Sequence, residues 1–250
     1  MNNVRTVSDT KRAFYAVHTR PIHSVYRRVV EELMVEMHLL SVNADFRYDP
    51  VYALGVVSSF DCFMQGYEPE RDRESIFTGL CRSVEADPQH YRSDAEQLRS
   101  AMSGMSAEGA IAALANKGEG TNSDLLKSTL HSIASNNRFK YSRLFAIGLF
   151  TLLETADAEL VKDSKKLAEA LKTIGEGLNV SADKLTKDLE LYRSNVDKMT
   201  QAVAVLKDVV AADRKKREER SNQAKEKEAA VATADASSES TDKPEEESQS

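Results

Sequence analysis

The chain has no tryptophan, two cysteines, ten glycines and five prolines among its 250 residues. So few glycines and prolines argue against a sheet-rich fold, which needs many tight turns. Cys62 and Cys81 form no CxxC pair and supply no disulfide framework. Each cysteine lies within an apolar helical pattern. We therefore expect two buried free thiols, which suit a reducing compartment.

Long hydrophobic runs are also missing. Residues 1–12 contain no apolar stretch of the kind that a secretory signal peptide requires. The longest apolar run, at 144–153, is about half of the ~20 residues that a membrane-spanning helix needs. We therefore predict no signal peptide and no transmembrane segment. Any association with a membrane is then expected to be peripheral or to occur through a partner.

No region is strongly basic. The formal net charge is −6, and segment 214–228 carries seven basic and four acidic residues, whereas 229–250 carries six acidic residues and one lysine. A nucleic-acid-binding domain would show a larger basic excess, so no nucleic-acid partner is predicted. Two glutamates interrupt the basic cluster at 214–220. This favours a solvated helix end over a surface for anionic lipid.

The sequence is rich in helix signals. In the first 66 residues, Ser8 can cap one helix, and Pro21 suits the first turn of a second. Asp49 with the proline that follows it opens a third helix, which Gly66 can close. This third helix is apolar nearly all round, so we expect it to lie at the centre of a bundle.

Further helices are predicted after Pro69, after Pro88 and after Ser106, and two more precede residue 157. The last of these, at 139–156, is apolar on most faces and is the second expected central helix. No part of 1–155 alternates apolar and polar residues for long enough to form a strand. The predicted fold class is therefore all-α, a multi-helix bundle.

The chain changes character after residue 156. An apolar stripe at 157–175 is expected to break at Gly175 and Gly177, and a strict heptad begins after Ser181. The eight residues of this coiled-coil seam are Leu185, Leu189, Tyr192, Val196, Met199, Val203, Leu206 and Val210. Their spacing predicts a long C-terminal helix. The seam could pack back on the bundle or on a partner, and the spacing alone does not choose between these.

Composition predicts three regions. They are a helical bundle domain at 1–155, a helical or coiled-coil extension at 156–228 and a disordered acidic tail at 229–250. The tail from about residue 232 has no large apolar side chain to bury.

The N-terminal block, residues 1–66, is dense in histidine, tyrosine and glutamate, which raises the question of an active site. His18 and His23 lie five positions apart with a proline between them, so they do not share a helix face. His38 and Glu36 are two positions apart and point in different directions. HExxH and Glu-x-x-His motifs are absent from the sequence. We predict no catalytic, cofactor-binding or metal-ligating residues here.

Other catalytic motifs are weak. The stretch at 116–124 contains glycines but lacks GxxxxGK[ST], and it joins two helices, so a flexible connection accounts for it. A GxSxG nucleophile motif is absent. Arg27, Arg28 and Glu36 belong to a charged helix face. We regard these three as candidate partner-facing residues.

Three long segments resemble a known family. They are TVSDTKRAFYAVHTRPIHSVYRRVVEELMVEMHLL at 6–40, FRYDPVYALGVVSSFDCFMQGY at 46–67 and FKYSRLFAIGLFTLLETA at 139–156. Together with the coiled-coil region, they give residues 5–210 a specific resemblance to the thylakoid formation protein family. This family is a photosystem II biogenesis factor of cyanobacteria and chloroplasts.

The resemblance implies an all-helical accessory protein without an accepted active site or cofactor. It implies a role in photosystem II assembly or repair and in thylakoid organisation. It also implies association with the membrane-bound FtsH protease complexes that remove damaged photosystem subunits. Plant members carry a chloroplast transit peptide. This chain lacks one, so it resembles a cyanobacterial member or a mature form, peripheral to the thylakoid membrane on its cytoplasmic side.

Three functional hypotheses follow. The first is a non-enzymatic adaptor in photosystem II biogenesis and repair. The alternative is a cofactor- or pigment-binding helical bundle that uses the His/Tyr/Glu-rich N-terminal block. A third is a membrane-surface protein that uses the charged segment 214–228. The partner-binding surface and the oligomeric state stay open at this point.

Overall fold

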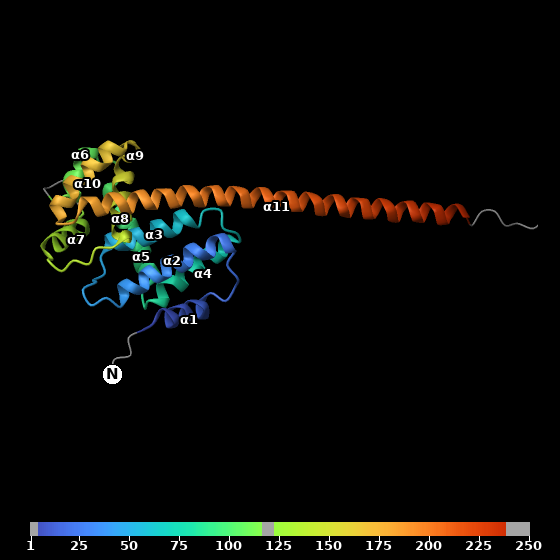
Figure 1. Cartoon of the computed structure of the whole chain (residues 1–250), viewed down its shortest axis with the longest axis horizontal. Coiled ribbons are helices and arrows are strands. Elements are labelled where there is room, and N and C mark those ends of the chain that lie inside the picture. The colour runs from blue at the N-terminus through green and yellow to red at the C-terminus, as the bar shows by residue number, and fades with distance from the viewer. Residues whose placement is uncertain (1–4, 117–122, 239–250) are drawn as a thin grey trace, which may run out of the picture. The chain divides into compact units, whose positions relative to one another are not determined.

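The computed structural model describes residues 5–116 and 123–238, with side chains through Arg220 and at Asn222. This part of the chain forms α-helices and contains no strand (Figure 1), so the all-α prediction is confirmed. The helices are α1 (Val7–Val17), α2 (Ser24–Ser41), α3 (Pro50–Phe63), α4 (Glu70–Ser83), α5 (Pro88–Met102), α6 (Ala107–Leu114), α7 (Asp124–Ser135), α8 (Arg143–Ala156), α9 (Ala158–Lys162), α10 (Ser164–Leu178) and α11 (Ala182–Ser238).

Local side-chain caps set most helix starts. Asp49 caps α3 as the sequence predicts, and Asp87 and Ser106 cap α5 and α6 at the predicted starts of these helices. The prediction for α1 was wrong by two positions, because Thr6 and not Ser8 is the cap. Thr6 and Asp9 form a reciprocal capping box that satisfies two backbone N–H groups, which Ser8 could not do alone.

Two apolar helices, α3 and α8, form the centre of the bundle. Every residue from Val51 to Phe60 of α3 is buried, and so is every residue from Leu144 to Leu153 of α8. The two helices pack directly on each other. Gly55 faces the carbonyl oxygen of Leu144, and Gly148 faces that of Val51, so that a Cβ at either glycine would overlap with backbone. This close crossing confirms both helices as central.

The chain divides into two compact units, Met1–Thr200 and Gln201–Ser250. The first unit includes α9, α10 and the start of α11, and α10 packs on α6, α7 and α9. The boundary between the two compact units, after Thr200, therefore lies further along the chain than the domain boundary predicted at 155. The reason is that part of the predicted extension has buried apolar side chains, among them Leu171 and Leu185.

The predicted helix break at Gly175 and Gly177 does not occur. Helix α10 runs through both residues and ends at Asn179, which adopts a left-handed conformation. A Cβ at Gly177 would overlap with the carbonyl oxygen of Ala115. This glycine therefore permits a close approach between chain segments and does not end the helix.

Helix α11 is longer than expected. It continues to Ser238, inside the segment predicted as a disordered tail from residue 229. Five of the ten residues at 229–238 are alanine, the best helix former, which accounts for the extra turns. Residues 239–250, the rest of the predicted tail, lie outside the described part of the structure.

Candidate functional site

The N-terminal block folds into core. Phe14, Tyr26, Met37 and Phe60 are at most 2% exposed. His38 is buried as well, and its Nδ1 lies 2.8 Å from the Thr10 hydroxyl. The density of aromatic residues in this block therefore reflects packing between helices.

His18 is the second buried histidine of the block. Its Nδ1 lies 3.0 Å from the Ser75 hydroxyl, whereas its Nε2 has no hydrogen-bond partner in the described structure. Burial lowers the pKa of His18, and the nearby Asp72 carboxylate opposes this effect. No group of three or more potential metal ligands occurs among the described residues. This arrangement favours a neutral imidazole between α1 and α4.

A second cluster of tyrosines, which the sequence did not reveal, joins the start of α3 to α5. The Tyr48 hydroxyl donates to Oδ2 of the buried Asp94, at 2.7 Å, and the Tyr48 ring stacks on His90. The rings of Tyr52 and Tyr91 lie against each other and against Tyr48. Burial raises the pKa of all three tyrosines. They therefore stay protonated and act as hydrogen-bond donors or packing groups.

Asp49 is buried beside this cluster. Its carboxylate accepts a hydrogen bond from the backbone N–H of Tyr52, at 2.8 Å. Burial nevertheless raises the pKa of Asp49 to about 7. Hydrogen bonds from the backbone N–H groups of Tyr52 and Val51 act in the opposite direction and lower this pKa. A cavity of about 260 Å³ adjoins it, lined by Arg47, hydroxyl-bearing residues of α7 and the Phe139 ring. The cavity is small, its lining mixes polar and apolar side chains, and nothing in the described structure selects a ligand for it.

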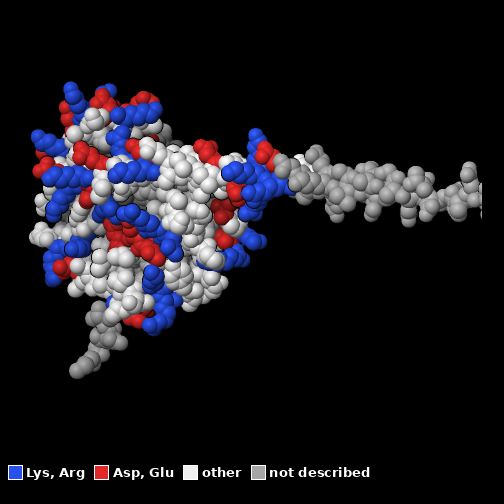
Figure 2. Space-filling model, turned by 45° about the vertical axis from the view of Figure 1, so that its right-hand side comes forward, with Lys and Arg blue, Asp and Glu red and all other residues white. Residues whose placement is uncertain are grey.

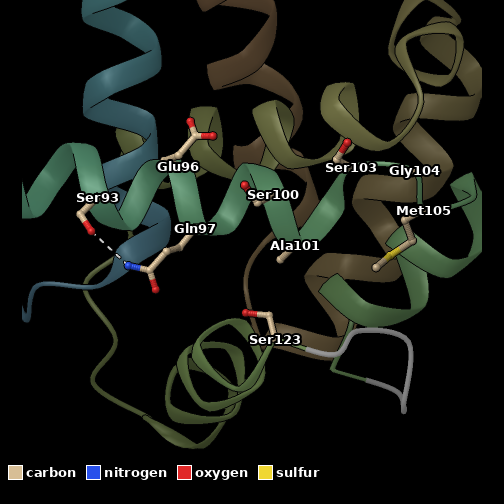
Figure 3. A pocket seen from close by; sticks show the side chains of 9 residues that line it. All are labelled: Ser93, Glu96, Gln97, Ser100, Ala101, Ser103, Gly104, Met105 and Ser123. Carbon is tan, nitrogen blue, oxygen red and sulfur yellow. Dashed lines mark hydrogen bonds between the residues drawn. The ribbon is translucent and has the colours of Figure 1, made fainter.

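A larger groove of about 860 Å³ lies along α5 (Figure 3). Its lining is mostly small and polar, with Gln97 donating to the Ser93 hydroxyl at 3.1 Å and Ser123 on the opposite side. Glu96 is its only charged side chain among the described residues. Because 117–122 adjoins Ser123 and lies outside the described part, we assign no chemistry to this groove.

The structure does not bring the three predicted partner-facing residues together as one free surface. Arg27 and Arg28 are exposed, and Arg28 pairs with Glu32 at 3.0 Å. Glu36 is only partly exposed, and its carboxylate accepts from Arg143 at 2.6 Å. Acidic and basic side chains intermingle over the face shown in Figure 2. The partner-facing role of these residues stays a prediction.

The first three seam residues lie in the core of the first unit. Leu185 and Leu189 are at most 1% exposed, and the buried Tyr192 ring makes edge contacts with Phe63 and Phe150. The Tyr141 hydroxyl also donates to Asp188 of α11, at 2.6 Å. The seam thus begins as part of the bundle. Its last three residues, Val203, Leu206 and Val210, belong to the second unit.

The family model described as thylakoid formation protein matches residues 6–221. The chain belongs to this family. Protein Thf1 of Nostoc punctiforme is 65% identical over 226 residues, which are 89% of this chain and 95% of that protein. Protein Thf1 of Trichormus variabilis is 62% identical over 224 residues, covering 90% of this chain and 96% of the relative.

The thylakoid formation protein fold has been observed in a related chain. A solved structure of Psb29 is 46% identical and aligns with a TM-score of 0.74, over 85% of this chain and 98% of the other. The resemblance seen in the three sequence segments is therefore confirmed. The family match also extends past residue 210, through Arg220, so it includes the basic residues that follow the seam.

This thylakoid formation protein has no helix, within the described residues, that is long and apolar enough to cross a membrane. Its histidine-rich block is bonded internally, through Thr10 and Ser75. The geometry thus gives no specific support to a pigment site in that block.

Proposed function

We propose that this thylakoid formation protein is a non-enzymatic adaptor in photosystem II biogenesis and repair and in thylakoid membrane organisation. It acts through association with FtsH protease complexes and photosystem II assembly components. The observation that carries this proposal is the family match over 6–221, together with the likeness to Psb29. Several aromatic side chains and two histidines of the N-terminal block are buried in the core, which supports a binding role over a catalytic one.

The adaptor is placed on the cytoplasmic side of the thylakoid membrane, as a peripheral protein. The absence of a membrane-spanning helix among the described residues is compatible with this placement. Attachment would then come from protein partners, since charges of both signs alternate on the visible surface of Figure 2.

Co-isolation tests the proposal. The tagged full chain is expressed in cyanobacterial cells and purified from detergent-solubilised thylakoids, and the bound proteins are identified by mass spectrometry. FtsH subunits and photosystem II components are expected in the bound fraction. Their absence, from preparations in which the tagged chain itself is recovered, would contradict the proposal.

Charge reversal tests the predicted partner-facing residues. The Arg27→Glu/Arg28→Glu variant is expected to recover several-fold less FtsH than the unmodified chain. Lys172→Glu, an exposed change on α10, is the matched control and should leave recovery unchanged. Equal recovery with both variants would remove Arg27 and Arg28 from the interface while leaving the adaptor role intact.

A further inference from the structure

In its described residues, the second compact unit presents an apolar face that no other element of the unit covers. In its described part, 201–238, this unit consists of α11 alone. Val205, Val209 and Val210 are 63%, 60% and 59% exposed. Burial of such side chains contributes about 25 cal/mol per Å² of apolar surface. A helix that keeps several of them together therefore gains from a partner surface.

This face is wider than the predicted coiled-coil seam. At ~100° per residue, six apolar side chains fall within an arc of about 160°. They are Ala202, Val203, Val205, Leu206, Val209 and Val210, and we call them the apolar arc. Gln201, Lys207 and Asp208 flank the apolar arc, about 40° to 60° beyond its two edges.

The width of the apolar arc indicates how many partner helices are needed to cover it. A two-stranded coiled coil buries a narrow stripe made of its a and d positions. A helix in a bundle buries a face of roughly 100° or more, because it contacts two neighbours. The apolar arc therefore fits a groove between two helices better than it fits the side of one.

Positive charge borders the apolar arc at its C-terminal end. Segment 201–220 holds six basic and four acidic residues. Arg214 and Arg217 are each paired with an acidic side chain on the same helix. Lys207 and Lys216 make no ion pair with any described side chain. A complementary surface would carry acidic side chains next to its apolar groove.

A second copy of the chain is a poorer match. A parallel pair would align two copies of segment 201–220, each with six basic and four acidic residues, and the like net charges of the two copies disfavour it. Pairing in either direction supplies one helix, which leaves part of the apolar arc uncovered. Only three seam residues lie beyond Thr200, and they span about one heptad, which is marginal for an isolated helix pair.

We propose that the apolar arc of α11 is a docking surface for a pair of helices of another protein, with acidic residues at the rim of their groove. This inference rests on the proposed adaptor function and gives that function a partner-binding face. Binding would remove the valines from water and neutralise the lysines that flank them.

Photo-cross-linking in the full chain tests this surface. A benzoylphenylalanine probe replaces Val209 in one version and Ala211 in the control, because Ala211 lies about 160° away on the same helix. After irradiation of cyanobacterial cells, the cross-linked peptides are sequenced by mass spectrometry. The Val209 probe is expected to join an amphipathic, Asp/Glu-rich segment of another polypeptide, at least tenfold more than the control probe. Adducts to residues 5–200, to a second copy or to lipid would overturn the proposal, and so would no adduct.

A pair of variants separates this inference from the proposed function. Val205→Asp/Val209→Asp places charge in the apolar arc, and Ala204→Asp/Ala211→Asp places the same charge on the other side. The first is expected to lower recovery of the cross-linked partner at least tenfold, and the second less than twofold. If FtsH and photosystem II components co-isolate equally with both variants, the docking surface is wrong and the adaptor role stands. If the unmodified chain recovers neither component, the adaptor role itself fails.

Discussion

At the scale of single residues, the crossing of α3 and α8 is the most sensitive point of the fold. Gly55 and Gly148 each face the other helix's backbone, and backbone cannot rotate away as a side chain can. Hydrophobic periodicity identifies both helices but carries no signal for how closely they approach. These two glycines could therefore not be predicted as contact points from the sequence.

Substitution of either glycine tests this crossing. Gly148→Ala is expected to lower the free energy of unfolding by about 3 kcal/mol or more, at or above the upper end of ordinary overpacking costs. Gly109→Ala is the control, because its new methyl group meets only side chains of Ser106 and Met105. That change should be near neutral or stabilising by about 0.5 kcal/mol. Urea denaturation measures both, and equal effects would contradict the close crossing.

His18 gives the fold a dependence on pH. Burial lowers its pKa from the ordinary value of 6.5, so the folded state binds fewer protons at this site than the unfolded state. The stability contributed by neutral His18 is present above pH 6.5 and is lost as the pH falls through the lowered pKa. His18→Gln is expected to reduce the loss of stability between pH 7 and pH 5. His131→Gln, at an exposed position, is the control and should leave that loss unchanged. If His131→Gln reduced the loss and His18→Gln did not, His18 would not be the source of the pH dependence.

At the scale of helices, caps were the most predictable feature. The Asp-Pro pairs that begin α3 and α5 are local signals, and the structure shows both caps. Helix ends were harder to predict, as α10 illustrates. Its two glycines suggested a break, but the tertiary approach of Ala115 explains Gly177 instead. Local propensity cannot distinguish a glycine that ends a helix from one that admits a neighbour.

Asp49 combines a helix cap with a buried charge. Its pKa is raised to about 7, so the stability that its protonated form contributes is present below pH 3.8 and lost as the pH rises through about 7. Asp49→Asn keeps a capping oxygen without the charge, and it should be more stable than the unmodified chain at pH 8. Asp49→Ala loses the cap, at a cost of about 1 kcal/mol. Thermal unfolding at pH 5 and pH 8 measures the stability of both variants and of the unmodified chain. If Asp49→Asn were less stable than the unmodified chain at pH 8, the buried charge of Asp49 would not be destabilising and the prediction would be contradicted.

At the scale of the whole molecule, α11 belongs to two environments. The heptad continues without change from Leu185 to Val210, so the sequence could not show where burial ends. The structure places Leu185, Leu189 and Tyr192 in the core of the first unit. The burial of Tyr192 depends on contacts with Phe63 and Phe150, which are distant in the sequence. The heptad spacing of α11 carries no information about these contacts.

Tyr192 is the last fully packed seam residue, so its removal should loosen α11 at that point. Tyr192→Ala is expected to cost about 3 kcal/mol, as large-to-small changes of aromatic core residues do. Leu191→Ala, at an exposed neighbouring position, should change stability by less than about 0.5 kcal/mol. Hydrogen exchange of the amides of 185–200 would report the loosening directly. Equal protection in both variants would show that Tyr192 does not anchor the helix.

The central claim is that this thylakoid formation protein serves photosystem II as an adaptor. The most direct measurement is the recovery of photosystem II activity after a strong-light treatment, in cells that lack the gene and in cells that have the full chain restored. The account predicts slower recovery without the protein and normal recovery with it. Recovery at the same rate in both strains would contradict the account.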